Sequence, residues 1–415
     1  MSKNHVPISI RSPVLYALMI LVGLWSGFSD IYFLKSFGLF VADVFIRIFK
    51  CISLPIIALS IIVTLSNYRS EGLMRRVWQR TLVYTLGTTL VAAAISCVLY
   101  NLIQPMPVSM QDVTNEVILP TSEISYLDHV ARLIPQTFLT PFLENQVLSV
   151  LFLGVIFGIA IRFIPDLEAR STITNFFRGL HGLMMVITRW VIAMIPLGLF
   201  GFITTTVVQL RAGGDLSGIG QYLLVIVLAN LIQGFIVLPL WLKIHGIRPF
   251  QMMRRMLPAL SLAFFSKSSV GTLPVTMDTI EKQLHVRPEI SRFVLPLCTS
   301  INMNGCAAFI FTTVIYLMQN HGMHVSLMAM MVWVVVATVA AIGNAGIPMG
   351  CFFLSVSLLA SMNVPITLMG VILPFYSLID MLETALNVWS DSCVTQVIHE
   401  NIIEADQEQQ MMVKS

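Results

Sequence analysis

The chain has 415 residues, of which 24 are basic and 21 acidic, while 56% are hydrophobic. Charged residues make up 11% of the chain, whereas soluble domains usually carry about 25%. This composition and a mean hydropathy of +0.84 argue against a soluble enzyme and predict an integral membrane protein with several spans. A net charge of +3 is too small to indicate nucleic-acid binding.

Long apolar runs in the first 250 residues predict a series of transmembrane helices. The first run follows a short polar segment and resembles a signal peptide. Because no small-residue cleavage site follows it, we expect a retained helix. The predicted helices cover roughly 13–29, 37–66, 81–104, 145–164, 173–210 and 220–243.

The charges of the connecting loops predict an orientation. Residues 68–80 and 243–255 are rich in arginine and lysine, whereas the loop 105–135 carries four acidic residues and one arginine. Basic loops stay on the cytoplasmic side, so the N-terminus and both basic segments are expected there, with 105–135 outside. The compact loops and the lack of an organelle-targeting peptide favour a bacterial inner membrane, with the tail 401–415 also cytoplasmic.

Beyond residue 256, the apolar stretches are interrupted by small and helix-breaking residues. Residues 258–277 have short apolar arms around KSSVGTLP (267–274), and 326–342 run into GNAGIP (343–348) before an apolar stretch resumes. The arms of the first element are too short to cross roughly 30 Å of hydrocarbon. Two half-depth hairpins fit better, and such paired interruptions point to a transporter's binding site. Kinked full-length helices remain the alternative.

Two further apolar helices carry polar residues at mid-depth. In 290–318, Asn302 and Asn304 flank a methionine and precede Gly305, which predicts an unwound turn. In 374–398, polar residues recur every three or four positions and share one helical face. They are Asp380, Glu383, Thr384, Asn387 and Asp391.

The three carboxylates of this polar stripe predict a cation pathway. A charged group inside an apolar span costs at least ~2.5–3.5 kcal/mol and marks an ion or substrate route by default. Residues 374–398 contain no basic residue that could neutralise them. Pairing with lysines elsewhere, or a place in the membrane interface, is the alternative.

The cysteines lie singly in apolar stretches, and none forms a CxxC pair. We therefore expect buried structural thiols rather than a disulfide framework or a metal site. The six are Cys51, Cys97, Cys298, Cys306, Cys351 and Cys393.

Four motifs, KSSVGTLPVT, NMNG, GNAGIP and D-x-x-E-T-x-x-N-x-x-x-D, closely resemble signatures of the dicarboxylate/amino acid:cation symporters. That family includes archaeal aspartate transporters and mammalian glutamate and neutral amino acid transporters. The resemblance is dense over 256–400 and looser over 13–250. It implies an all-α membrane fold with eight transmembrane helices, two re-entrant helical hairpins and a homotrimer.

The resemblance also implies that different parts of the chain form domains with different roles. Residues 1–255 would form mainly scaffold and trimerisation helices, together with some helices of the transport domain. Residues 256–400 would form the core of a transport domain that moves as an elevator, and 401–415 a cytoplasmic tail. The first hairpin would be entered from the cytoplasm, and the second, around 343–348, would act as the outer gate.

An amino acid site is implied residue by residue. Asp380 matches the aspartate that binds the substrate ammonium, which needs a carboxylate partner in a dry pocket. Asn387 matches the asparagine that bonds the α-carboxylate, helped by helix N-termini that favour anions. The other matching substrate positions are the backbone near Ser268, Ser269 and Gly346 and the side chain of Thr384.

Sodium sites are implied in the same way. Asp391 with Asn302 matches one oxygen-rich site, and Ser300 with the backbone around Asn344 matches a second site, closed by the outer gate. A third site would involve Thr88, Thr89 and Asn304. Asn304 replaces an aspartate there, and the loss of that charge puts the third ion in doubt.

Glu383 is the other departure from the family pattern. Members that carry acidic substrates place an arginine at this position, whereas a glutamate would repel aspartate or glutamate in a low-dielectric pocket. Lys267 matches an arginine of some relatives and is a candidate partner that would neutralise Glu383. The pocket would then suit neutral substrates.

The leading hypothesis is a sodium-coupled symporter that imports an amino acid with a neutral or cationic side chain. The main alternative is a glutamate/aspartate or C4-dicarboxylate symporter coupled to sodium or protons. An anion-conducting channel and an intramembrane enzyme are remote alternatives, and the sequence lacks HExxH, GxSxG and GxGD motifs. No cofactor is expected beyond the transported ions, and the expected partners are the substrate, the bilayer and further copies of the chain.

Overall fold

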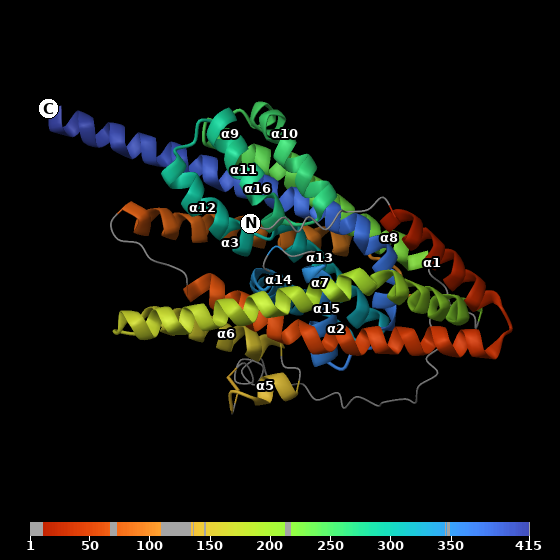
Figure 1. Ribbon diagram of the computed structural model, residues 1–415. Helices are drawn as coiled ribbons and strands as arrows, with labels where there is room; N and C mark the ends of the chain where they lie inside the picture. The colour runs from red at the N-terminus through yellow and green to blue at the C-terminus, as the bar shows by residue number, and fades with distance from the viewer. Residues whose placement is uncertain are drawn as a thin grey trace.

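The computed structural model describes residues 11–66, 73–108, 134–135, 137–144, 147–211, 217–344, 346 and 349–414. Within these ranges the chain is helical, and no strand occurs among them (Figure 1). The predicted all-α class is therefore confirmed. Most of the acidic loop 105–135 that bears on the predicted orientation lies outside the described residues.

The first part of the chain forms long apolar helices. They are α1 (Arg11–Phe28), α2 (Tyr32–Ser66), α3 (Leu73–Ile103), the short α5 (Thr140–Leu143), α6 (Val147–Arg162) and α7 (Leu167–Arg211). The sixth predicted helix is built from α8 (Ser217–Ile232), the π-helical η1 (Gln233–Val237) and α9 (Leu238–Ile244). The predicted helices are all present, but α3 begins at Leu73. Arg75, Arg76 and Arg80, predicted in a loop, therefore lie in its first turns.

Two of these helices form a long platform. α2 and α7 pack against each other and against α1 and α6, and they run side by side in Figure 1. Buried apolar side chains such as Phe45, Ile61 and Leu199 fill the contacts. Other large apolar side chains of the same helices, including Leu21 and Trp190, are exposed. Exposed apolar surface of this kind suits contact with lipid rather than water.

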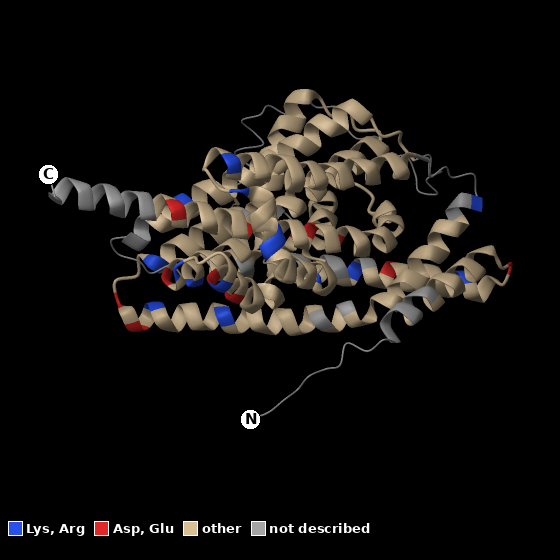
Figure 2. Ribbon diagram, turned by 90° about the horizontal axis from the view of Figure 1, so that it is seen from above, with Lys and Arg blue, Asp and Glu red and all other residues tan. Residues whose placement is uncertain are grey.

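Within the described residues, four helical segments are long and apolar enough to cross a membrane by length and composition. They are Val77–Ile103, Gly218–Ile244, Pro288–Asn320 and Thr367–Ile402. A pair bent by 52°, Leu167–Thr188 and Ala193–Val208, adds a fifth if it forms one span. Charged residues are sparse along most of the ribbon (Figure 2), in keeping with the predicted membrane protein.

The second part of the chain consists of helices interrupted by short breaks. The helices are α10 (Pro249–Ser266), α11 (Ser269–Gln283), α12 (Pro288–Ile301), α13 (Asn304–Asn320), α14 (Leu327–Ile342), α15 (Gly350–Ser361) and α16 (Thr367–Lys414). α12 ends and α13 begins on either side of Asn302 and Met303, so the predicted unwound turn is present. α10 and α11 pack against each other, and α14 and α15 both pack on α13.

The interruption between α10 and α11 contains fewer residues than the sequence predicted. Lys267 ends α10 in the left-handed conformation, with φ of 56°, and Ser268 caps α11 by accepting a hydrogen bond from Gly271 N at 3.0 Å. Only Lys267 and Ser268 are non-helical, whereas 267–274 was expected to be interrupted. The serine cap satisfies a backbone N–H that would otherwise lack a partner, which lets the helix restart at once.

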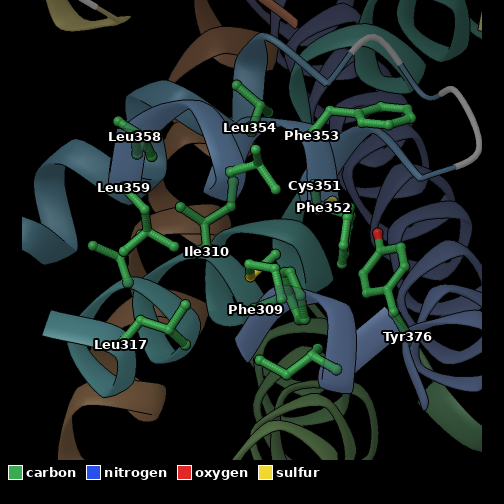
Figure 3. Packing of buried hydrophobic residues seen from close by; sticks show 14 of the residues in the cluster. Phe309, Ile310, Leu317, Cys351, Phe352, Phe353, Leu354, Leu358, Leu359 and Tyr376 are labelled. Atoms are coloured by element: carbon green, nitrogen blue, oxygen red, sulfur yellow. The ribbon is translucent and has the colours of Figure 1, made fainter. Parts of the chain in front are cut away.

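The core surrounds α13, which lies against α3, α8, α14, α15 and α16. Figure 3 shows Phe309 and Ile310 of α13 beside apolar side chains of α15, with Tyr376 of α16 close to Phe352. The ring centroids of Phe309 and Tyr376 are 4.7 Å apart. The broken helix is therefore held on several sides by close packing.

Candidate functional site

The breaks in the helices meet at one place. Gly346, between α14 and α15, has φ of +63°, and a Cβ atom added there would lie 2.8 Å from the carbonyl oxygen of Thr299 and 3.4 Å from Cβ of Ser269. Only glycine permits this backbone conformation and this close approach without strain. The tip of the second predicted hairpin therefore lies against the C-terminal end of α12 and close to the start of α11 in the first hairpin.

A second glycine brings α13 against α16. A Cβ atom on Gly305 would lie 2.7 Å from Cα of Glu383 and 2.8 Å from Oδ1 of Asn230. Gly305 N donates a hydrogen bond to Oδ1 of Asn387 at 2.9 Å. This bond satisfies an N–H in the first turn of α13, which has no partner within its own helix. The polar face of α16 thus lies directly under the break in the membrane-embedded helix.

All five residues of the polar stripe on α16 are buried. Oδ2 of Asp380 accepts a hydrogen bond from Met349 N, at the start of α15, at 3.2 Å. Thr384 donates from Oγ1 to the Asp380 carbonyl at 2.7 Å. Asp380 therefore contacts the second hairpin, whereas the Thr384 hydroxyl proton is used within its own helix.

The carboxylate of Glu383 is buried and has few hydrogen-bond donors to offset the loss of contact with water. Tyr376 donates from its hydroxyl to Oε2 at 3.4 Å, and Oε1 has no hydrogen-bond partner among the described residues. The suggested pairing with Lys267 is wrong for this structure, because the Lys267 ammonium donates to Oγ of Ser377 at 2.5 Å. Lys267 also lies within electrostatic range of Asp380. The position of the backbone explains why Lys267 does not pair with Glu383. Lys267 lies at the tip of the first hairpin, which faces the turn of α16 that contains Ser377, before the turn that contains Glu383.

Asp391 and Asn302 lie together, as the sequence comparison implied. Asn302 donates from Nδ2 to Oδ1 of Asp391 at 2.9 Å, and both side chains are buried. Oδ1 of Asn302 accepts from Thr88 Oγ1 at 3.0 Å and from Asn304 Nδ2 at 2.8 Å. The suggested sodium site at Asp391 and Asn302 therefore belongs to the same hydrogen-bond network as Thr88 and Asn304 of the suggested third site.

Gln233, which the sequence analysis missed, completes this network. It lies in the π-helical η1 and donates from Nε2 to Oδ1 of Asn304 at 2.6 Å and to the carbonyl of Thr88 at 3.1 Å. Asn304 in turn donates to Oγ of Ser390 at 2.9 Å. The hydroxyl of the adjacent Thr89 is buried and has no hydrogen-bond partner in the described segments. A glutamine in the apolar run 220–243 was the available signal.

Ser300 and Asn344 are not linked in the same way. Ser300 donates to the carbonyl of Pro296 at 3.3 Å, within its own helix. Asn344 donates from Nδ2 to Sγ of Cys306 at 2.9 Å, and its buried Oδ1 has no hydrogen-bond partner among the residues that the structure describes. No hydrogen bond joins the two within the part of the chain that the structure describes. Asn344 does, however, lie beside the break that follows Ser300, since it also contacts Met303.

Two cysteines differ from their predicted role as single buried thiols. Cys306 of α13 and Cys351 of α15 form a disulfide, with Cα atoms 5.5 Å apart. They are 45 residues apart in sequence, so only the packing of the second hairpin on the broken helix brings them together. Of the remaining four, Cys51 is exposed, which also departs from the expected burial, and the other three are buried.

Known proteins resemble this chain over most of its length. The model of the sodium:dicarboxylate symporter family matches residues 14–401. A Caenorhabditis elegans protein, glt-4, that carries the name of a sodium-dependent excitatory amino acid transporter is 27% identical over 88% of this chain and 82% of its own length. Rabbit neutral amino acid transporter B(0) is 26% identical over 85% of this chain and 71% of its own length. The Escherichia coli proton/glutamate-aspartate symporter is 24% identical over 86% and 83%.

Proposed function

The chain belongs to the sodium:dicarboxylate symporter family, and from that premise we propose that it imports an α-amino acid with a neutral or cationic side chain on a sodium gradient. The relatives named above include transporters of excitatory and of neutral amino acids, so family membership alone does not choose between substrates. The choice rests on the side chains that line the polar face of α16.

The observation that carries the proposal is Glu383. Its carboxylate is buried, one oxygen lacks a hydrogen-bond donor, and no lysine or arginine pairs with it among the described residues. It lies one helical turn from Asp380, the proposed ligand of the substrate ammonium. A substrate bound through Asp380 would therefore direct its side chain toward a second acidic group.

The size of the resulting preference follows from Coulomb's law. Two unit charges about 4 Å apart interact by about 4 kcal/mol at an effective dielectric constant of about 20. A carboxylate on the substrate side chain would lose this energy and a cationic group would gain it, and each change corresponds to about a thousandfold in affinity. A neutral side chain fits if Glu383 carries a proton.

Ion coupling follows from the neighbouring network. Asp391 supplies the negative charge and Asn302 a neighbouring amide for one sodium ion, and the backbone near Ser300 and Asn344 supplies oxygens for a second. We assign no third ion to Thr88, Thr89 and Asn304, because the amide groups of Gln233 and Asn304 already bond to one another there. A neutral hydrogen-bonded network replaces the charge that a third cation would need.

The proposal includes the architecture implied by the family resemblance. We assign eight transmembrane helices, with α10–α11 and α14–α15 as re-entrant hairpins, and a homotrimer of elevator type. The core of the transport domain is 256–400, and 1–255 supplies mainly the scaffold. We place the protein in a bacterial inner membrane with both termini in the cytoplasm. The hydrogen bond from Met349 to Asp380 supports a gating role for the second hairpin.

A glutamate/aspartate or C4-dicarboxylate symporter is the second candidate. It is favoured by the similarity to the Escherichia coli proton/glutamate-aspartate symporter and by the cationic Lys267 near Asp380. In that arrangement a substrate carboxylate would turn toward Lys267 and away from Glu383. Protons could then replace sodium as the coupling ion.

Uptake into proteoliposomes tests the proposal. The panel contains radiolabelled neutral, basic and acidic amino acids together with succinate and malate, each with and without an inward sodium gradient. We expect concentrative, sodium-dependent uptake of a neutral or basic amino acid and weak competition by aspartate at neutral pH. Strong aspartate competition, or uptake of dicarboxylates alone, would overturn the proposal in favour of the second candidate. Dissipation without accumulation would indicate a channel.

A further inference from the structure

A cluster of metal-ligating groups lies where the second hairpin meets the broken helix. Cys306 of α13, Cys351 of α15 and Glu383 of α16 each offer one ligand atom, and these atoms all lie within 4.8 Å of one another. All three side chains are at most 2% exposed. No other such group of three occurs among the described residues. Figure 3 shows Cys351 in the apolar packing between α13 and α15.

Independent features of the surroundings also indicate a ligand. Oε1 of Glu383 is buried without a hydrogen-bond partner among the described residues, and a carboxylate oxygen of Glu383 lies within 4.8 Å of both sulfur atoms. Sγ of Cys306 accepts from the amide groups of Asn344 at 2.9 Å and Asn387 at 3.4 Å. Such outer contacts orient a ligand atom and favour its anionic form.

We propose that Cys306, Cys351 and Glu383, once the disulfide is reduced, form a binding site for a thiophilic divalent cation of the zinc and cadmium class. Two thiolates and one carboxylate match the donors that these ions prefer, and three protein ligands leave a fourth position open. Sodium and magnesium prefer oxygen ligands, which makes them poor competitors for the sulfur atoms.

The chemistry balances in two steps. Reduction by a phosphine consumes one water molecule, converts the disulfide to two thiols and oxidises the phosphine to its oxide. Binding of the divalent cation then releases the two thiol protons and forms two metal–sulfur bonds. In the oxidised protein each sulfur is bonded to the other, so neither is available as a thiolate ligand.

A bound cation would tie three elements together. In the reduced protein it would replace the link that the disulfide makes between the first turns of α15 and α13, and it would extend that link to the polar face of α16, beside the Asp380 contact with Met349. Under the proposed transport function, this would hold the second hairpin closed and inhibit uptake. That consequence rests on the proposed function, whereas binding of the cation does not.

Cadmium titration of the purified full-length protein in detergent tests the site. After phosphine reduction, we expect the ultraviolet charge-transfer absorption of cadmium–thiolate bonds, which saturates at one equivalent per chain. Cys306→Ser and Cys351→Ser should each weaken binding at least tenfold, and Glu383→Gln should weaken it by a smaller factor. Cys51→Ser, which removes an exposed thiol elsewhere, is the matched control and should leave the titration unchanged.

A measurement on the unmodified chain keeps the test valid if a serine variant fails to fold. In the unmodified chain, the cadmium–thiolate absorption should appear only after reduction of the disulfide, and cadmium should leave the exposed Cys51 reactive toward alkylation, as read by mass spectrometry. The proposal is overturned if the absorption persists in the double Cys306→Ser, Cys351→Ser variant, or if cadmium protects Cys51 instead. Because neither readout uses substrate, a wrong substrate assignment would not affect them.

Discussion

Asp391→Asn offers the sharpest test of ion coupling. The substitution keeps the shape of the side chain and its contact with Asn302, since the asparagine oxygen can still accept the 2.9 Å hydrogen bond. It removes one unit of negative charge from a site where Asp391 is 1% exposed. At about 4 Å and an effective dielectric constant of about 20, that charge contributes about 4 kcal/mol to holding a monovalent cation. We therefore expect sodium affinity to fall by about three orders of magnitude.

The assay is the sodium dependence of substrate uptake and of sodium binding, measured by calorimetry on the purified protein. The folded state should persist, because a neutral side chain is less costly to bury than a carboxylate. Ser392→Ala is a matched control, since Ser392 is buried on the same helix and, among the described residues, bonds only to the Val388 carbonyl. A folded Asp391→Asn protein with unchanged sodium affinity would refute the assignment of Asp391 to the ion.

Three other substitutions examine neighbouring parts of the site. Asp380→Asn should reduce amino acid uptake at least a hundredfold, because a buried charged group that loses its partner costs roughly 3–5 kcal/mol; normal uptake would disprove its role as the ammonium ligand. Glu383→Arg should shift competition toward aspartate, measured at two pH values, because a guanidinium can hold a carboxylate in a bidentate pair; an unchanged substrate order would show that Glu383 selects nothing. Gln233→Ala should lower thermal stability by about 1–3 kcal/mol, because Oδ1 of Asn304 loses its 2.6 Å donor; an unchanged melting temperature would contradict the network described.

Hydropathy was sufficient to predict the helices because each apolar run is long compared with the error in locating its first and last residues. The break at Asn302 and Met303 was also predictable, since polar residues beside a glycine disfavour a regular apolar helix. The start of α3 was predicted too late because its first turns contain arginines, which hydropathy treats as loop. Arginines at the end of a membrane helix can reach the interface with their long side chains.

The family resemblance predicted the contact of Asp391 with Asn302, but two other contacts between distant segments were not predicted. The pairing of Cys306 with Cys351 depends on the docking of α15 on α13, which spacing along the chain does not encode. The position of Lys267 depends on a left-handed turn at the tip of the first hairpin, and this turn directs the ammonium to Ser377 rather than to Glu383. Side chains of α16 were predictable as a group because a single helix fixes their relative positions.

If Asp380 binds the substrate ammonium as proposed, the hydrogen bond from Met349 to Asp380 makes the second hairpin and that ammonium competitors for one carboxylate. In the absence of an amino acid, the backbone N–H of the hairpin would be the partner of Asp380, which would favour the closed position of the hairpin. A bound substrate ammonium would offer a stronger, charge-assisted bond and would displace that N–H. Closure of the hairpin over bound substrate would then depend on other contacts of the hairpin tip, such as that of Gly346 with Thr299. The single side chain of Asp380 would thus control both the closure of the hairpin in the substrate-free transporter and the binding of the substrate.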